Sequence, residues 1–70
     1  MSNWPSSKAK QVLKALQRIG YSIKSQRGSH VRLIHPERGE YIFAFHDSDE
    51  IGPVMLSKLA KKTGLKPEDL

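Results

Sequence analysis

The spacing of apolar and polar residues along this chain predicts two helices and three strands. Residues 7–19 contain one apolar stripe, whose spacing places its side chains on one side of an α-helix. The stripe consists of Val12, Leu13, Leu16 and Ile19. Ser6 and Ser7 precede it as suitable N-cap residues, and Gly20 follows where helices often end in a left-handed residue. The pattern therefore predicts a helix that is capped by serine and ends near Ile19.

The following stretch alternates apolar and polar residues, as β-strands do. We expect the first strand at residues 21–26 and the second at residues 29–35, with a tight turn at Arg27-Gly28 between them. Residues 36–39 form another turn, and residues 40–46 form the third strand. The two faces of this third strand are Tyr41, Phe43, Phe45 and Ile42, Ala44, His46. Both are largely apolar, so the sequence leaves open which of them is buried.

The second strand has two different faces. The more apolar face consists of Ser29, Val31, Leu33 and His35. We expect this face to pack against the helices, because the apolar side of a half-exposed sheet faces the core. His30 and Arg32 then point from the open side of the sheet, two residues apart.

The last third of the chain predicts a polar loop at residues 47–52 and a helix from Pro53 to about Thr63. The buried stripe of this helix is expected to be Met55, Leu56 and Leu59. One more helical turn follows at the C-terminus. The fold class is therefore α+β with the order α-β-β-β-α, in which a three-stranded antiparallel sheet has two helices on one face. At a length of 70 residues, we expect the chain to form a single domain, residues 1–70, and it has no internal repeat.

The charge distribution indicates a polyanionic partner. The net charge is +5, and residues 1–35 carry seven lysines and arginines but no acidic residue. Residues 36–50 carry five acids and one arginine. One half of the chain thus offers a positive surface to a polyanion such as nucleic acid, and an acidic segment follows it.

Several functional classes are excluded or disfavoured by composition. The chain has no cysteine, which excludes a disulfide scaffold, a thiolate metal site and a cysteine nucleophile. The three histidines are separated by five and eleven residues, which matches no metal-ligand motif, so we expect no cofactor. The first residues lack the apolar core of a signal peptide, and no apolar run approaches the ~20 residues needed to cross a membrane. We therefore expect a cytoplasmic protein.

His30 is the candidate for chemistry. Imidazole exchanges protons near neutral pH. Cleaving RNA without a metal requires a base that removes the 2′-hydroxyl proton and cations that offset the charge growing on the phosphate. His30 together with Arg27, Arg32 and nearby lysines could supply both. The alternative is an exposed histidine without a role.

The other distinctive side chains have structural interpretations. His35 is expected to be a hydrogen-bonded structural residue, and His46 a strand-end residue bonded to the acidic loop, or else a second proton carrier near His30. We expect Trp4 to anchor the N-terminal arm and at least two of the tyrosines and phenylalanines to be buried.

The order of these motifs resembles the HicA toxin family. The similarity runs from about Ser7 to Leu65, through "SKAKQVLKALQRIGYSIKSQRGSHVRLIHPE", a strand that ends in a histidine, and a helix that ends in "LAKKTGL". Its most specific part is Gly28-Ser29-His30 followed by His35-Pro36. Ile19-Gly20-Tyr21 and Thr63-Gly64-Leu65 support it.

The resemblance implies a fold similar to a double-stranded RNA-binding domain. It implies an mRNA interferase, that is, a metal-independent endoribonuclease toxin that cleaves mRNA and is inhibited by a HicB-type antitoxin. The family's catalytic histidine corresponds to His30. With it, the expected RNA-binding residues are Lys24, Arg27, Gly28, Ser29 and Arg32. A masking antitoxin is expected to cover His30.

Two departures from the family pattern keep alternatives open. Val31 stands where members often have a second histidine or another bulky residue, and residues 52–55 replace a basic stretch before the last helix. Asp47, Asp49 and Glu50 precede that helix and would repel RNA locally. A non-catalytic RNA-binding module, or an inactive relative that acts through an antitoxin-like partner, is therefore the alternative to an active ribonuclease.

Overall fold

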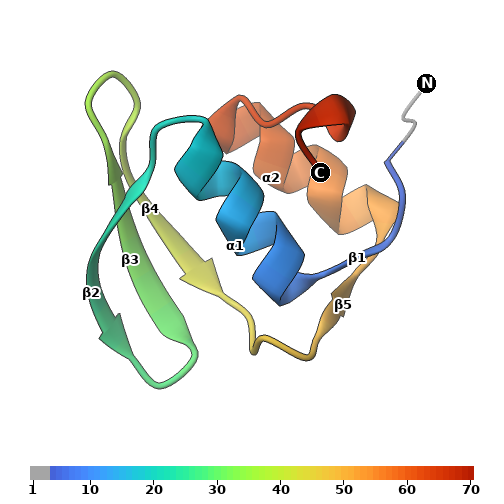
Figure 1. Cartoon of the computed structure of the whole chain (residues 1–70), viewed down its shortest axis with the longest axis horizontal. Coiled ribbons are helices and arrows are strands. Elements are labelled where there is room, and N and C mark those ends of the chain that lie inside the picture. Colours follow the sequence, from blue (N-terminus) through green and yellow to red (C-terminus); the bar gives the residue numbers. More distant parts are fainter. Residues whose placement is uncertain (1–3) are drawn as a thin grey trace.

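Two helices lie side by side against one face of a three-stranded antiparallel sheet in the computed structural model, which describes residues 4–70 (Figure 1). The sheet has the order β2-β3-β4. The elements are β1 (Ser7–Lys8), α1 (Ala9–Arg18), β2 (Ser22–Arg27), β3 (His30–His35), β4 (Gly39–Ala44), β5 (Glu50–Ile51), α2 (Pro53–Thr63) and a final 3₁₀ turn, η1 (Pro67–Asp69). The predicted α+β class and the α-β-β-β-α order are confirmed.

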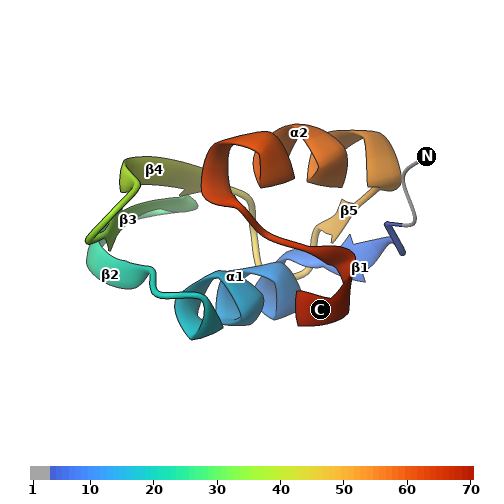
Figure 2. The same ribbon diagram turned by 90° about the horizontal axis from the view of Figure 1, so that it is seen from above.

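A second, two-stranded pair was not expected from the sequence. β1 and β5 pair antiparallel, with Ser7 opposite Ile51 and Lys8 opposite Glu50. Each strand leads directly into a helix, so the pair holds the N-terminal ends of α1 and α2 together (Figure 2). The expectation of an unbroken loop over residues 47–52 is wrong, because two-residue strands are too short to show an alternating pattern.

The expectation that Ser6 or Ser7 caps the first helix is also wrong. The N-cap position is Lys8, and its side chain makes no capping hydrogen bond. Ser7 lies in β1, where its buried hydroxyl donates to the carbonyl oxygen of Pro5 over 3.1 Å. Pairing with β5 therefore displaces the start of the helix past both serines.

Backbone carbonyls from the acidic loop take over the capping role. The amide of Ala9 donates to the carbonyl oxygen of Asp49 over 2.8 Å, and the amide of Lys10 donates to that of Asp47 over 3.3 Å. The first amides of a helix lack partners within the helix and need acceptors from elsewhere. The loop between β4 and β5 supplies these acceptors, which gives this acidic segment a structural function.

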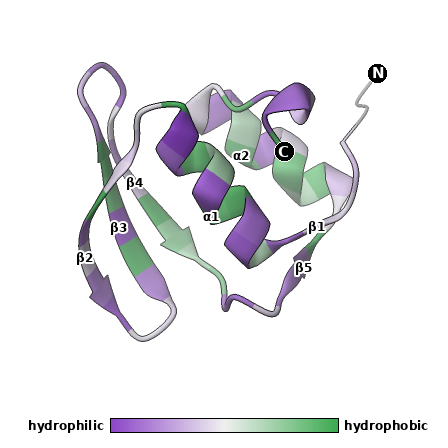
Figure 3. Cartoon of the chain, in the orientation of Figure 1, coloured by the Kyte–Doolittle hydropathy of each residue, from purple (hydrophilic) through white to green (hydrophobic). Residues whose placement is uncertain are grey.

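The core lies between the sheet and the helices. Its largest fully buried side chains are Phe43, Leu16, Leu33, Ile51, Leu56, Val12 and Thr63. Figure 3 shows the matching pattern, with hydrophobic bands on the helices interrupted by hydrophilic ones. Tyr21 and Phe43 are buried and Trp4 packs against the core, so both of these expectations are confirmed. On β4 the buried face is the aromatic one, because Phe43 points inward while Ile42 is 45% exposed.

Met55 is not part of the core, contrary to the expected stripe. The buried residues of α2 are Leu56, Leu59 and Thr63, while Met55 is 46% exposed. The buried spacing of three and four residues defines the inward side of the helix, and Met55 is rotated about 100° from Leu56 around the helix axis. The hydroxyl of Thr63 donates to the carbonyl oxygen of Leu59, which allows this polar residue to be buried.

Glycines at the ends of both helices lie against side chains from the end of β3 and from the β3–β4 turn. Gly20 has a φ of 116°, and a Cβ there would lie 2.7 Å from Nε2 of His35. Gly64 has a φ of 76°, and a Cβ there would lie 2.5 Å from the guanidinium of Arg38. The guanidinium is placed favourably at the negative end of the α2 dipole. This end of the sheet is thus fastened to both helices.

Candidate functional site

His30 occupies the first position of β3, at the tip of the β2–β3 hairpin. It is exposed on the open face and lies opposite Arg27 of β2 on one side and Ala44 of β4 on the other. A two-residue turn, Gly28-Ser29, connects the strands, and the φ of 60° at Gly28 suits the first central position of such a turn. The expected outward direction of His30 is confirmed. The turn itself lies one residue later than expected, because Arg27 belongs to the strand.

Arg32 lies on the same open face but has its own partner. Its Nε hydrogen-bonds and forms an ion pair with the carboxylate of Glu40, on the neighbouring strand. Both side chains are substantially exposed. This is the only ion pair within residues 4–70. Of the two arginines expected beside His30, Arg27 therefore keeps an uncompensated charge, whereas the charge of Arg32 is balanced.

The other expected RNA-binding residues lie along the same hairpin. Lys24 is exposed at an irregularity of β2, where the pairing with β3 shifts register between Ile23 and Ser25. A Cβ built at Gly28 would meet no atom within 4 Å, so a ligand could approach the backbone closely there. Ser29 is half-buried. The hairpin tip thus brings together Arg27, Gly28, Ser29 and His30.

A hollow of about 250 Å³ lies behind this tip, on the helix-facing side of the sheet. The lining residues are Leu13, Gln26, Gly28, Ser29, Val31, Phe45, His46 and Asp47. This hollow could not be predicted from the sequence, because its walls come from α1, from the β2–β3 hairpin and from the residues after β4, which are far apart along the chain. It brings His46 and Asp47 next to the turn that precedes His30.

The backbone of His46 is bonded to the acidic loop, as expected from the sequence. Its amide donates to Oδ2 of Asp49 over 3.0 Å, and its carbonyl oxygen accepts from the amide of Asp49 over 2.9 Å. β4 ends at Ala44, so His46 lies beyond the sheet. A role for His46 as a second proton carrier stays a prediction.

His35 is the structural histidine that the sequence predicted. Its Nδ1 accepts hydrogen bonds from the amides of Glu37 and Arg38, over 3.0 and 3.2 Å. Nε2 lies 3.0 Å from the carbonyl oxygen of Ile19. Because Nδ1 faces two donors and Nε2 faces an acceptor, these partners assign the proton to Nε2. The ring also stacks at a tilt on Tyr21, with 4.8 Å between centroids.

The described part of the chain places no three histidine, aspartate, glutamate or cysteine side chains where together they could hold a metal ion. Neither of its helices has the length and hydrophobicity to span a membrane.

Comparison with known proteins agrees with the sequence motifs. A family model described as the HicA toxin of bacterial toxin-antitoxin systems matches residues 9–65. A search of curated proteins finds no match. The matched segment extends from the start of α1 past the end of α2 and includes the whole hairpin that carries His30. The chain therefore belongs to the HicA toxin family of bacterial toxin–antitoxin systems.

Proposed function

We propose that this chain is a cytoplasmic endoribonuclease toxin that cleaves mRNA without a metal ion and uses His30 as its single catalytic residue. The observation that carries the proposal is the position of His30, exposed at the tip of a hairpin and paired across the strands with Arg27. Membership of a toxin family supports it.

In the proposed reaction, a ring nitrogen of neutral His30 takes the proton of a ribose 2′-hydroxyl. The 2′-oxygen then attacks the adjacent phosphorus, and the bond from phosphorus to the 5′-oxygen of the next nucleotide breaks. The leaving 5′-oxygen takes up a proton from water, so the products are a 2′,3′-cyclic phosphate and a 5′-hydroxyl. A positioned base of this type contributes about 10²–10⁴-fold to the rate.

Cationic groups on the hairpin are proposed to hold the phosphate. Arg27 lies closest in register to His30, and a guanidinium can donate two parallel hydrogen bonds to phosphate oxygens. The open space at Gly28 lets the backbone approach as well. Arg32 would exchange Glu40 for RNA, at a small cost because an exposed ion pair contributes only about 0–1 kcal/mol. Lys24 would extend the contact along β2.

The acidic loop does not argue strongly against this function. The carboxylate of Asp49 already accepts the amide of His46, and Asp47 lines the hollow on the helix-facing side of the hairpin. His30 points to the opposite side. The alternative function is RNA binding without cleavage. It is favoured by the ion pair of Arg32 with Glu40, because an arginine that stays paired cannot offset the charge that grows on the phosphate during cleavage.

The proposed partner is a HicB-type antitoxin that covers His30 in the inactive complex. Because His30 is exposed in the isolated chain, a protein seated on the open face would block both the base and phosphate access. A complex in which the His30 ring stays open to solvent would contradict inhibition by simple masking.

The test is incubation of purified protein with mRNA in EDTA. Wild type should produce fragments with 2′,3′-cyclic phosphate ends, and His30→Ala should cleave at least about 100-fold more slowly while still binding RNA. His46→Ala tests the role left open for that residue. Cleavage should be retained if His30 is the single catalytic residue, whereas a loss as large as that of His30→Ala would make His46 the second proton carrier. Equal cleavage by wild type and His30→Ala would remove His30 from the mechanism. RNA binding without cleavage by either protein would favour the binding module.

A further inference from the structure

The two free edges of the sheet differ in how well they are protected. β2 has an irregularity at Lys24 and carries two positive charges, and bulges and charges are devices that stop edge strands from pairing with other chains. β4 pairs with β3 in unbroken register over six residues, and its one charged residue, Glu40, is engaged by Arg32. Figure 3 shows β4 as the more hydrophobic of the two. β4 is therefore the edge that can accept another strand.

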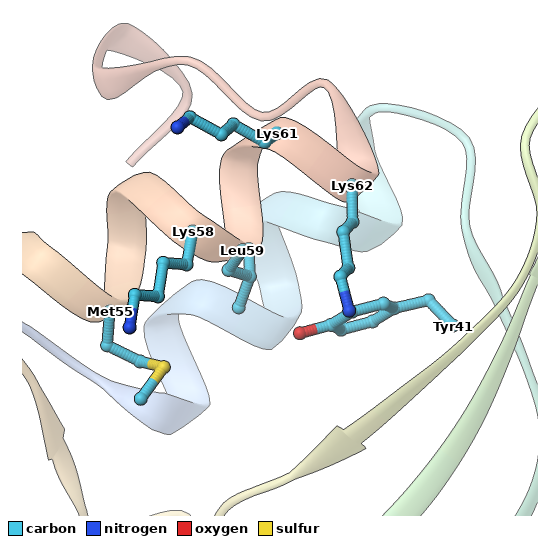
Figure 4. A pocket seen from close by; sticks show the side chains of 6 residues that line it. All are labelled: Tyr41, Met55, Lys58, Leu59, Lys61 and Lys62. Atoms are coloured by element: carbon cyan, nitrogen blue, oxygen red, sulfur yellow. The ribbon is translucent and has the colours of Figure 1, made fainter.

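A groove runs beside this edge, between β4 and α2. Its volume is about 390 Å³, and Figure 4 shows Tyr41 of β4 facing Met55 and Leu59 of the helix. Lys58, Lys61 and Lys62 line it as well, and the side chain of Lys62 extends toward the Tyr41 ring. The groove thus has an apolar floor and a basic rim.

The helix beside the groove also exposes apolar surface and carries no negative charge. Val54 is 72% exposed, and Met55 is 46% exposed. α2 contains three lysines and no acidic residue, and none of these lysines forms an ion pair in the part of the chain that the structure describes. Exposed apolar side chains next to unbalanced charges of one sign fit a partner that has both apolar and acidic side chains.

We propose that β4 and this groove form a docking site for an extended acidic segment of a partner protein, which adds to the sheet as a fourth strand. Backbone hydrogen bonds to β4 would supply affinity, as in other cases of strand addition. Side chains on one face of the added strand would enter the groove, with apolar groups over Met55 and carboxylates near Lys58 and Lys62. Side chains on its other face would lie beside Ile42.

Two other occupants fit less well. A second copy of this chain, paired through β4, would bring two sets of α2 lysines together, and each copy already carries a net charge of +5. RNA would use the lysines but would leave the apolar floor of Met55 and Leu59 unmatched. Charge complementarity together with an apolar floor therefore selects an acidic protein segment.

The site is distinct from the open face that carries His30. Tyr41 lies on the helix-facing side of β4, and Ile42 lies on the open side, directly opposite Arg32. A strand along this edge could therefore hold a partner in place without itself covering His30. The identification of this partner as the antitoxin rests on the proposed function. The docking of an acidic strand at β4 does not depend on that function.

The experiment uses the full chain carrying His30→Ala, so that catalysis plays no part. The probe is an eight-residue peptide, Val-Thr-Glu-Thr-Val-Thr-Glu-Thr, one face of which alternates valine and glutamate. The peptide with glutamine in place of glutamate is its uncharged control. Binding is followed by NMR of the backbone amides and by calorimetry. We expect shifts confined to β4 and α2, and a Kd at least about tenfold weaker for the glutamine peptide.

Matched variants separate the proposed site from general effects. Ile42→Lys and the pair Lys58→Glu with Lys62→Glu should each weaken binding at least about tenfold. Ile23→Lys is the control for Ile42→Lys. Ile23 lies on the other edge strand, β2, and is 43% exposed, whereas Ile42 is 45% exposed, so the substitution should leave the Kd for the peptide unchanged. Lys10→Glu with Lys14→Glu makes the same change of net charge on α1 and should have a much smaller effect.

Each other outcome overturns the proposal. Three results would exclude the β4 site. The peptide could shift amide signals of β2 and not of β4, the two charge-reversed double variants could lose peptide affinity equally, or the peptide could fail to bind at concentrations up to about 1 mM. If sedimentation shows that the protein is a dimer, and that Ile42→Lys makes it a monomer, the β4 edge binds a second copy of the chain. The double variant Lys58→Glu, Lys62→Glu is also made in a chain that retains His30. If this variant cleaves RNA more slowly but still binds the peptide, the groove binds RNA.

Discussion

The imidazole of His35 lies directly against the backbone of Gly20, so close that a methyl group at Gly20 would overlap its Nε2. The same nitrogen reaches the carbonyl oxygen of Ile19 at the end of α1. The last residue of β3 is thereby joined to the end of the first helix. This contact depends on glycine twice, once for space and once for the positive φ.

Gly20→Ala should destabilise the protein by about 3 kcal/mol, because it combines a disfavoured backbone conformation with a steric clash. Gly39→Ala is the matched control, since Gly39 also has a positive φ but nothing within 4 Å of its Cβ position. That variant should lose only about 1 kcal/mol. Urea unfolding measures both free energies, and equal losses would mean that the His35 contact contributes nothing.

His35→Ala should lower the free energy of unfolding by about 2 kcal/mol. It leaves the carbonyl oxygen of Ile19 and the amides of Glu37 and Arg38 without their side-chain partner, and it removes the ring from Tyr21. His30→Ala should change stability by less than about 0.5 kcal/mol, because its side chain is exposed. Thermal unfolding of the two variants side by side checks this difference.

Glu40→Gln should tighten RNA binding, because it releases Arg32 from its ion pair and removes a negative charge from the open face. The slope of log K against log salt concentration should steepen by about one unit. Stability should change by less than about 1 kcal/mol, as the pair is exposed. Glu37→Gln removes the same charge from a residue without an ion pair among residues 4–70 and provides the control. An identical gain in both variants would show that only net charge matters.

Stability should fall in alkaline solution through two tyrosines. Burial raises the pKa of Tyr21 above its ordinary value of 10.0, although Arg38 acts in the opposite direction. Burial also raises the pKa of Tyr41, and Tyr21 adds to this effect. A raised pKa means that the folded state binds the phenol proton more tightly than the unfolded chain does. The contribution of the two protonated phenols to the free energy of unfolding is therefore complete below pH 10. It is lost as the pH rises through the pKa values that the tyrosines have in the folded state.

The double variant Tyr21→Phe, Tyr41→Phe should lose less stability than wild type between about pH 9 and 12. Lysines titrate over the same range in both proteins, so the difference between the two curves isolates the tyrosines. Urea unfolding at a series of pH values measures it. Parallel curves would contradict the prediction.

The sequence predicted the elements that have a clear period and missed those that depend on distant contacts. α2 begins at Pro53 and ends before Gly64 as expected, because proline and glycine act locally at these ends. The start of α1 and the strand β5 could not be predicted, because both depend on pairing across more than 40 residues. Met55 was wrongly expected to be buried. The sequence shows that this helix has an apolar stripe, but it does not show how wide a part of the helix contacts the rest of the core.

The same distinction applies to the candidate site. Strict alternation along β3 was enough to place His30 and Arg32 outward and Val31 inward. The ion pair of Arg32 with Glu40 could not be foreseen, because it depends on the register between two strands and not on their separate patterns. The free edge of β4 likewise follows only from strand order.

His30 and His35 are the two ends of one strand, about 17 Å apart at the usual rise per residue. His35 lies against Gly20, just past the end of α1, while His30 projects from a hairpin whose other strand, β2, is exposed along its whole length. Residues that maintain folding and residues that would meet a substrate are thus kept spatially apart. Successive substitutions could therefore diversify the surface at the tip without eroding the fold on which that surface is built.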